Sequence, residues 1–298
     1  MNPVPETLNP VVQPVLCFGE ILWDSLPQGL FPGGAPINVA YHLKQLGLNP
    51  VPVTAVGRDF LGDELLRRLE RWGLPAAGVT RNEQPTGAVL VELNEAGVPK
   101  FNILEGVAWD RIELSPALRA LAPQAAAVIY GTLAQRCEPN RELLGQLLEL
   151  ASGALRILDV NLRPPYDERV VWELAAKAHV IKLNHDELHT LTDGRFGLED
   201  VEPAARALAE RTGCESICVT AGARGAGSLL DDRWHWADAR PVVVKDTVGS
   251  GDAFLASITR SLLAGSEAPQ QMLERACRLA EYVATQEGAM PPHPAQVA

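Results

Sequence analysis

Short apolar runs alternate with longer amphipathic stretches along most of this chain. A short apolar run is typical of a buried strand, whereas apolar residues three and four positions apart predict a helix. Across the middle of the sequence, the strands are predicted at 128–130, 156–159 and 180–183, and the intervening helices at 140–151 and 168–178. Parallel strands joined by helical crossovers produce this order. We therefore expect a layered α/β fold with a mainly parallel central sheet that helices cover on both faces.

The same patterns continue toward both ends of the chain. They predict further strands at 15–18, 51–56 and 217–220 and helices at 60–73, 198–212 and 270–286. Two β-hairpins are also predicted, one from residues 88–93 and 98–104 around a glycine-containing turn at 94–97, and one at 229–234. His293, which lies between prolines near the C-terminus, is expected at the surface.

A glycine-rich turn near the C-terminal end leads directly into a predicted helix. After the apolar run 242–244, which predicts a strand, residues 246–254 are Asp-Thr-Val-Gly-Ser-Gly-Asp-Ala-Phe. A helix N-terminus offers unpaired N–H groups and partial positive charge, so Gly249, Ser250 and Gly251 predict an anion site suited to phosphate. Asp252 in the first turn can accept a proton from a hydroxyl group. The alternative is that Asp252 is a plain helix cap.

A second helix is also entered through glycines. Gly33 and Gly34 precede a predicted helix whose apolar stripe extends to residue 43 and which ends at Gly47. The helix has a proline in its first turn. Paired glycines allow the backbone to approach a polyhydroxyl ligand closely. The amide of Asn38 can both donate to and accept from hydroxyl groups. Asn38 could instead cap the helix or bond locally.

Polar residues follow three of the predicted strands. Ligands of parallel sheets collect at these carboxyl ends. The residues in question are Asp159 to Arg163 after one strand, Asn184 to Glu187 after the next, and Thr220 and Gly222 after a third. Without further information, Glu187 is interpreted as a residue of a helix first turn and the glycines after Thr220 as an ordinary connection.

Composition and charge exclude several classes of function. Of 298 residues, 47% are hydrophobic and 21% charged, which is ordinary for a soluble enzyme. The net charge of −11 argues against nucleic acid or an anionic membrane as partner. Residues 1–13 lack the features of a secretory signal, and we expect them to form a flexible tail. Five scattered cysteines suit reduced thiols, and we expect a cytoplasmic protein.

Both glycine turns resemble signatures of one family. Residues 246–254 match every fixed position of Asp-Thr-x-Gly-Ala/Ser-Gly-Asp-x-Phe, the C-terminal signature of the ribokinase-like (phosphofructokinase-B) carbohydrate kinases. Residues 33–40 resemble that family's N-terminal signature, Gly-Gly-x-x-x-Asn-x-Ala. The resemblance implies a ribokinase-like layered α/β/α kinase domain at 14–298, with a small β-sheet lid contributed by residues around 20–32 and 85–107.

The resemblance also implies a role for each candidate residue. Asp252 would take the proton of a sugar hydroxyl, and Gly249, Ser250 and Gly251 would bind the transferring phosphoryl group. Sugar-binding roles fall to Asp24, Gly33, Gly34, Asn38 and Arg163, with Arg163 near the transferring phosphate. ATP would be contacted by Asn184, Thr220 and Gly222, and Mg²⁺ organised near Asn184 and Glu187. Asp246 would join a K⁺ site beside the turn, or it could equally cap that turn.

The expected function is transfer of the γ-phosphoryl group of ATP to a sugar hydroxymethyl group. Fructose is the leading candidate because residues 19–24, 33–40 and 159–163 resemble fructokinase-type members, while kinases of ribose, 2-keto-3-deoxygluconate or a nucleoside stay open. A dinucleotide-dependent oxidoreductase would need a glycine fingerprint that the first strand lacks. A non-catalytic sugar-binding regulator would have no reason to keep Asp252. Lid sheets of this family often pair between subunits, which leaves a homodimer open.

Overall fold

The computed structural model describes residues 13–26, 28–93 and 99–294. The expected flexible tail at 1–13 therefore lies almost entirely outside the described residues, as does the hairpin turn at 94–97. Two sheets organise the described part of the chain, a large one of nine strands and a small one of four.

The large sheet is mainly parallel, as the alternation of strands and helices predicts. Only the pairings of β11 with β12 and of β12 with β13 are antiparallel. In spatial order its strands are β13 (Arg233–Asp238), β12 (Gly225–Leu230), β11 (Ser216–Thr220), β10 (Val180–Asn184), β9 (Leu155–Asp159), β8 (Ala127–Gly131), β1 (Pro14–Phe18), β4 (Asn49–Gly57) and β5 (Val79–Asn82).

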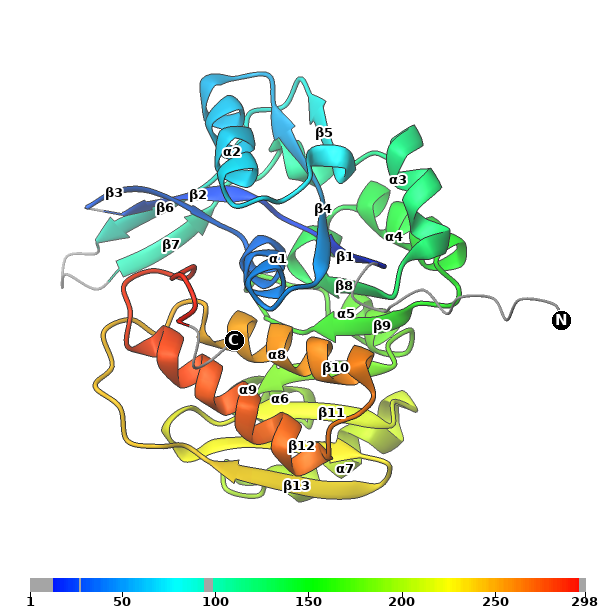
Figure 1. Cartoon of the computed structure of the whole chain (residues 1–298), viewed down its shortest axis with the longest axis vertical. Helices are drawn as coiled ribbons and strands as arrows, with labels where there is room; N and C mark the ends of the chain where they lie inside the picture. Colours follow the sequence, from blue (N-terminus) through cyan, green and yellow to red (C-terminus); the bar gives the residue numbers. More distant parts are fainter. Residues whose placement is uncertain (1–12, 27, 94–98, 295–298) are drawn as a thin grey trace, which may run out of the picture.

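Helices cover both faces of this sheet (Figure 1). Alternate residues of β1 show why, since Val15 and Cys17 join one hydrophobic cluster whereas Leu16 and Phe18 join the other. The helices contributing to the first of these clusters are α1 (Ala35–Gln45), α2 (Phe60–Arg71), α8 (Ser250–Ala264) and α9 (Pro269–Ala284). The helices of the second are α3 (Pro116–Leu121), α4 (Glu138–Leu150), α5 (Glu168–Ala175), α6 (His185–Leu191) and α7 (Val201–Thr212).

The small sheet lies at the carboxyl edge of the large one, because β2 begins only a few residues after β1 ends (Figure 1). Its strands in spatial order are β3 (Gly29–Gly33), β2 (Leu22–Leu26), β6 (Gly87–Leu93) and β7 (Pro99–Ile103). β2 is parallel to β6 and antiparallel to β3, and β6 and β7 form the predicted antiparallel pair. The small sheet therefore flanks the edge where ligands of a parallel sheet collect.

The strand predicted from the apolar run 242–244 is wrong. The three valines lie in a connection outside both sheets, and Val243 is 84% exposed. A run of β-branched residues favours extended backbone, but a strand also needs a partner, and β13 already ends at Asp238.

The expectation that His293 is a surface residue is also wrong. His293 is half-buried and stacks on the fully buried ring of His42 in α1, with 5.0 Å between the ring centroids. Nδ1 of His42 lies 2.8 Å from Nε2 of His293, and Nε2 of His42 donates to the carbonyl oxygen of Ala289. The C-terminal segment is thus held against α1.

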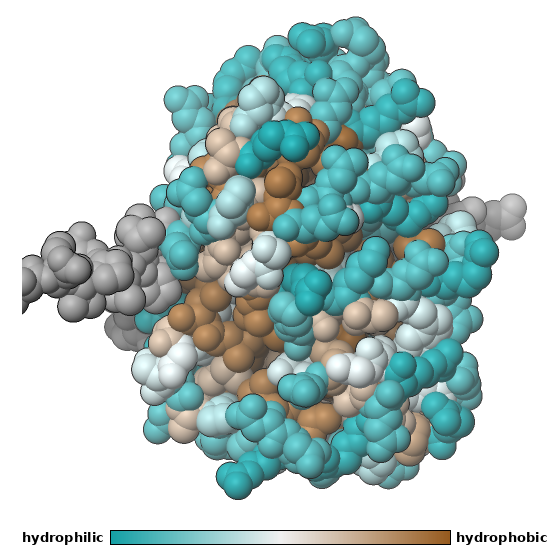
Figure 2. Space-filling view, turned by 90° about the vertical axis from the view of Figure 1, so that its right-hand side faces the viewer, coloured by the Kyte–Doolittle hydropathy of each residue, from teal (hydrophilic) through white to brown (hydrophobic). Residues whose placement is uncertain are grey.

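Figure 2 shows one face of the molecule, where hydrophilic residues cover the upper and lower parts and hydrophobic residues gather in the middle. In the part of the chain that the structure describes, no helix combines the length and the apolar character that crossing a membrane requires.

Candidate active site

The glycine turn before α8 is shaped by a close approach of the C-terminal segment. Gly249 caps the helix with a φ of 81°, and a Cβ added there would lie 2.5 Å from the carbonyl oxygen of Ala289. Only glycine tolerates both conditions. The turn at the start of α8 carries no side chain at residues 249 and 251, which allows an anion to approach its N–H groups closely. The backbone N–H of Ser250 donates a long hydrogen bond of 3.3 Å to the carbonyl oxygen of Thr247. This carbonyl competes with an anion for the N–H of Ser250.

Asp252 and Asn38, from opposite ends of the sequence, meet at this turn. Nδ2 of Asn38 donates a 2.8 Å hydrogen bond to Oδ2 of Asp252, and both side chains are buried. Burial, followed by the nearby charge of Asp159, raises the pKa of Asp252 to about 6, although Lys182, Asn38 and Arg163 act to lower it. Oδ1 of Asn38 is buried without a hydrogen-bond partner among the described residues, so it can accept from a ligand hydroxyl.

The turn into α1 brings Gly33 against the carboxylate of Asp24 and Gly34 against the backbone of Glu20. A Cβ on Gly33 would collide with the carboxylate of Asp24, and one on Gly34 would collide with the backbone carbonyl of Glu20. Oε1 of Glu20 accepts a 3.2 Å hydrogen bond from the N–H of Ala35. The glycines thus let the α1 turn pack directly on the strand that carries Asp24.

Asp24 lies half-buried on β2 in the small sheet. Burial raises its pKa to about 6, against the opposing effect of Arg163. Arg163 follows β9 in an exposed position and influences Asp24, Glu20 and Asp252 electrostatically. The predicted sugar-binding residues are therefore grouped around the α1 turn, with Arg163 facing them from the large sheet.

Two predicted nucleotide-contacting residues end neighbouring parallel strands. Asn184 of β10 is in register with Thr220 of β11. Gly222 follows Thr220 with a φ of 57°, which suits glycine. These residues lie at the carboxyl edge of the sheet, as their positions after strands predict.

Glu187 and Asn184 form a reciprocal capping box at the start of α6. Oδ1 of Asn184 accepts from the N–H of Glu187, and Oε2 of Glu187 accepts from the N–H of Asn184, each at 2.9 Å. Oε1 of Glu187 accepts from the N–H of Leu162 at 2.8 Å. Burial, opposed by Lys182, raises the pKa of Glu187. Both oxygens keep lone pairs for water, so the pair fits a hydrated Mg²⁺ better than one held directly.

Asp246 closes the other side of the glycine turn. Its Oδ1 accepts from the N–H of Val248 at 3.0 Å, and its Oδ2 from the N–H of Gly288 at 3.2 Å. These bonds match the capping role, one of the two alternatives that the sequence allows for Asp246. Across the described ranges, no three His, Cys, Asp or Glu side chains come together as a metal cluster.

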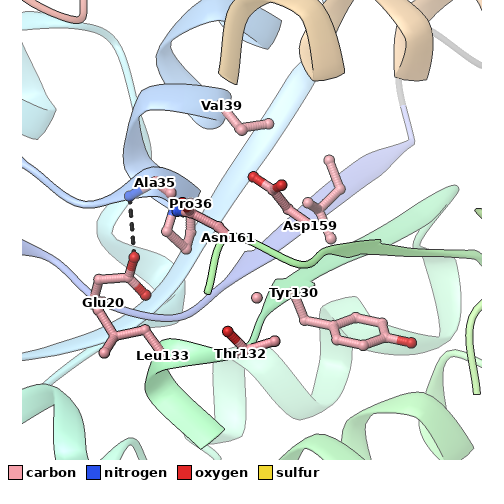
Figure 3. Close-up of a pocket in the computed structure, with 11 residues that line it drawn as sticks. Glu20, Ala35, Pro36, Val39, Tyr130, Thr132, Leu133, Asp159 and Asn161 are labelled. Carbon is pink, nitrogen blue, oxygen red and sulfur yellow. Dashed lines mark hydrogen bonds between the residues drawn. The ribbon is translucent and has the colours of Figure 1, made fainter. Parts of the chain in front are cut away.

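Sequence reasoning gave no role to Glu20, Asp159 or Lys182, which the structure adds to this region. Glu20 and Asp159, with Thr132 and Asn161, border a small hollow under the start of α1 (Figure 3). Burial raises the pKa of Glu20 to about 7. Lys182 lies beside Asp159 and is 93% buried. The sequence feature that could have drawn attention to Lys182 is its position as the one charged residue in the apolar run 180–183.

This chain is similar to known carbohydrate kinases. A sequence profile described as pfkB family carbohydrate kinase matches residues 27–296. A fructokinase of Salmonella typhimurium is 29% identical over 304 residues, which span 95% of this chain and 96% of that one. Fructokinase of Vibrio cholerae O395, solved with fructose, ADP and calcium ion, superimposes with a TM-score of 0.78 at 23% identity, covering 95% and 96% of the two chains. The 2-dehydro-3-deoxygluconokinase of Thermotoga maritima gives 0.82 at 19% identity, covering 94% and 96%.

Proposed function

The chain belongs to the pfkB family of carbohydrate kinases, and we propose that it transfers the γ-phosphoryl group of ATP to a hydroxymethyl group of fructose. The observation that carries this proposal is the meeting of Asp252 and Asn38 at the glycine-rich start of α8. A carboxylate that can act as a base, an amide that can bind a hydroxyl group, and a helix N-terminus that can bind an anion are then next to one another.

Asp252 acts as the general base in this proposal. As the sugar oxygen attacks the γ-phosphorus, its proton passes to the Asp252 carboxylate. The bond between the γ-phosphorus and the bridging oxygen of ADP breaks at the same time. A carboxylate with a pKa of about 6 is ionised at neutral pH yet basic enough to accept this proton.

The start of α8 supplies the electrostatic part of catalysis. N–H groups at Gly249, Ser250 and Gly251, together with the helix dipole, stabilise negative charge on the transferring phosphoryl group. Such donors act without reorganising, because the backbone of the turn is fixed by its contacts with Ala289 and Asp246.

The nucleotide occupies the carboxyl ends of β10 and β11. Thr220, Gly222 and Asn184 contact its phosphates, and Glu187 would hold a hydrated Mg²⁺ through water. When bound, Mg²⁺ neutralises charge on the β- and γ-phosphates. Asp246 remains a proposed part of a K⁺ site beside the turn. The Vibrio cholerae fructokinase, solved with ADP and calcium ion, supports a nucleotide and a metal ion as partners.

Fructose is favoured over other sugars by the curated relatives, several of which are fructokinases. Asp24, Gly33, Gly34 and Asn38 bind its hydroxyl groups. A second candidate is a sugar acid such as 2-dehydro-3-deoxygluconate, favoured by the exposed guanidinium of Arg163 beside these residues. That cation could pair with a substrate carboxylate.

We further propose that residues 14–298 act as one kinase domain, with the small sheet as a lid that excludes water from the transfer. Leu30, Phe31 and Leu90 are exposed large hydrophobic residues on this sheet, which supports pairing of two lids in a homodimer. Use of ATP and five cysteines that form no disulfide support a cytoplasmic location.

A panel of sugars tests the proposed reaction. Release of ADP is measured with ATP, Mg²⁺ and each of fructose, ribose, glucose, 2-dehydro-3-deoxygluconate and adenosine. The proposal expects the highest kcat/KM with fructose. Highest activity with the sugar acid would favour the second candidate, and no acceptor-dependent ADP release with any of them would contradict the proposal.

A further inference from the structure

A buried ion pair lies beside the proposed base without belonging to any predicted site. Lys182 of β10 is in register with Asp159 of β9, and its Nζ is 3.0 Å from Oδ1 of Asp159. The side chains are only 8% and 6% exposed. Because both charges lose their hydration, a buried pair of this kind is weak evidence for a stabilising role.

The ammonium of Lys182 lies directly beneath the first turn of α8. A Cβ added to Gly251 would be 3.0 Å from Nζ, so a side chain at this position would press on the ammonium. Gly251 is also the residue immediately before Asp252. The lysine therefore reaches the proposed anion-binding turn from the sheet, in which Lys182 belongs to β10.

Asp159 fixes the position of this ammonium. One of its oxygens pairs with Lys182, whereas Oδ2 is buried with no hydrogen-bond partner in residues 13–26, 28–93 and 99–294. Asp159 also borders the hollow shown in Figure 3. The Asp159 carboxylate thus both pairs with Lys182 and lines the hollow.

Charged and polar groups face Asp252 from several elements. They are Asn38 on α1, Asp159 on β9, Arg163 after β9, Lys182 on β10 and, more remotely, Glu20 after β1. Lys182 is also faced by Glu187 of α6. Asp159 and Lys182 act on Asp252 in opposite directions, the former disfavouring and the latter favouring its charged form.

We propose that Lys182, held under Gly251 by Asp159, is a positioning residue for phosphoryl transfer that keeps the Asp252 carboxylate charged. This inference rests on the proposed function, in which Asp252 is the base. Neither Lys182 nor Asp159 gains or loses a proton in the step. The proton moves only from the sugar hydroxyl to Asp252, while the O–P bond to the sugar forms and the O–P bond to ADP breaks.

If Lys182 and Asp159 act through their charges, substitutions that neutralise one or the other should shift the pKa of Asp252 in opposite directions. A purely structural role predicts no such opposite shifts. Lys182→Met removes a positive charge, so the pKa of Asp252 should rise and the acid limb of kcat/KM should move to higher pH by about one unit or more. Asp159→Asn removes a negative charge and should move the limb to lower pH. The double variant should return it toward the wild-type position, and Lys177→Met, at an exposed lysine after α5, should leave it unchanged.

The pKa of Asp252 can also be measured without turnover, by NMR of ¹³C-labelled aspartate carboxyl groups with Asp252→Asn as the assignment control. Opposite shifts in Lys182→Met and Asp159→Asn would support the inference even if fructose proved to be the wrong acceptor. Unmoved pKa values, or shifts in the same direction, would overturn it. Lys182→Arg keeps the positive charge, so the pKa of Asp252 should stay at its wild-type value in this variant. If Lys182→Met folds poorly, this comparison separates the effect of charge from the effect of loosened packing.

Discussion

Nδ2 of Asn38 donates a 2.8 Å hydrogen bond to Oδ2 of Asp252, joining two residues that are 214 positions apart in sequence. The bond connects the first turn of α1 to the first turn of α8. It orients the carboxylate and favours its charged form. Because Oδ1 of Asn38 has no other partner in the described part of the chain, one amide can hold the base and receive a substrate hydroxyl.

Asp252→Asn should abolish most of the proton transfer while preserving the shape of the site. We expect kcat to fall by about 10²- to 10⁴-fold, because an amide cannot accept the proton. Nucleotide affinity, measured by isothermal titration calorimetry, should stay near the wild-type value. Asp231→Asn, at an exposed turn with a φ of 49°, is the matched control and should keep full activity. A kcat within a factor of two of wild type in Asp252→Asn would refute the base assignment.

Asn38→Ala should change both sugar affinity and pH dependence. Removing the amide takes away one contact with sugar hydroxyls, so the KM for fructose should rise. It also removes a hydrogen bond that lowers the pKa of Asp252, so the acid limb of kcat/KM, expected near pH 6 in wild type, should move to higher pH. Steady-state kinetics from pH 5 to 8 measure both effects. An unchanged limb together with an unchanged KM would show that the hydrogen bond has no role in the reaction.

Gly249→Ala should destabilise the fold more than Gly265→Ala. Both glycines have positive φ, 81° and 62°, so alanine at either is expected to cost on the order of 1–2 kcal/mol. Only at Gly249 would the new Cβ also meet backbone, with Cα of Ala289 2.6 Å away, whereas nothing lies within 4 Å at Gly265. Chemical denaturation of the two variants compares these costs. Equal free energies of unfolding would contradict the close contact between the turn and the C-terminal segment.

The buried His42 should make the fold sensitive to acid. Burial, followed by the neighbouring His293, lowers the pKa of His42 to about 3, whereas an unfolded histidine titrates near 6.5. Between these values only the unfolded chain binds the proton, so the free energy of unfolding falls as pH drops. At pH 5 this amounts to about 2 kcal/mol.

His42→Gln provides the comparison for that effect. The difference in free energy of unfolding between wild type and variant should shrink from pH 8 to pH 5, because the variant has no histidine to protonate at this position. Comparing the two proteins cancels the opposite contributions of Glu20, Asp24 and Asp252, whose raised pKa values favour the fold on acidification. A difference that is constant with pH would show that His42 is not held neutral by the fold.

The two glycine turns could be predicted from the sequence because each is a local feature of the chain. Gly249 and Gly33 each precede a helix within a few residues, so the pattern predicts helix ends that bind ligands. The alternation of strands and helices then predicts that Asn184 and Thr220 lie on one edge of a parallel sheet, and the register of β10 and β11 confirms that they are neighbours.

Features that depend on packing between distant segments were not predictable in the same way. Lys182 lies in an apolar run, and only the register of β9 and β10 shows that Asp159 is its partner. The valines at 242–244 have strand-like side chains but no strand beside them. His293 looks like a tail residue until the C-terminal segment folds back against α1.

The central claim is that Asp252 assists attack by a sugar hydroxymethyl group on the γ-phosphorus of ATP. The most direct test is ³¹P NMR, without proton decoupling, of fructose, ATP and Mg²⁺ incubated with wild type and with Asp252→Asn. We predict that wild type forms ADP and a phosphomonoester whose signal is a triplet, from coupling to the two protons of a CH₂ group, and that the variant forms almost none. A signal without triplet splitting, or equal product from both proteins, would contradict the account.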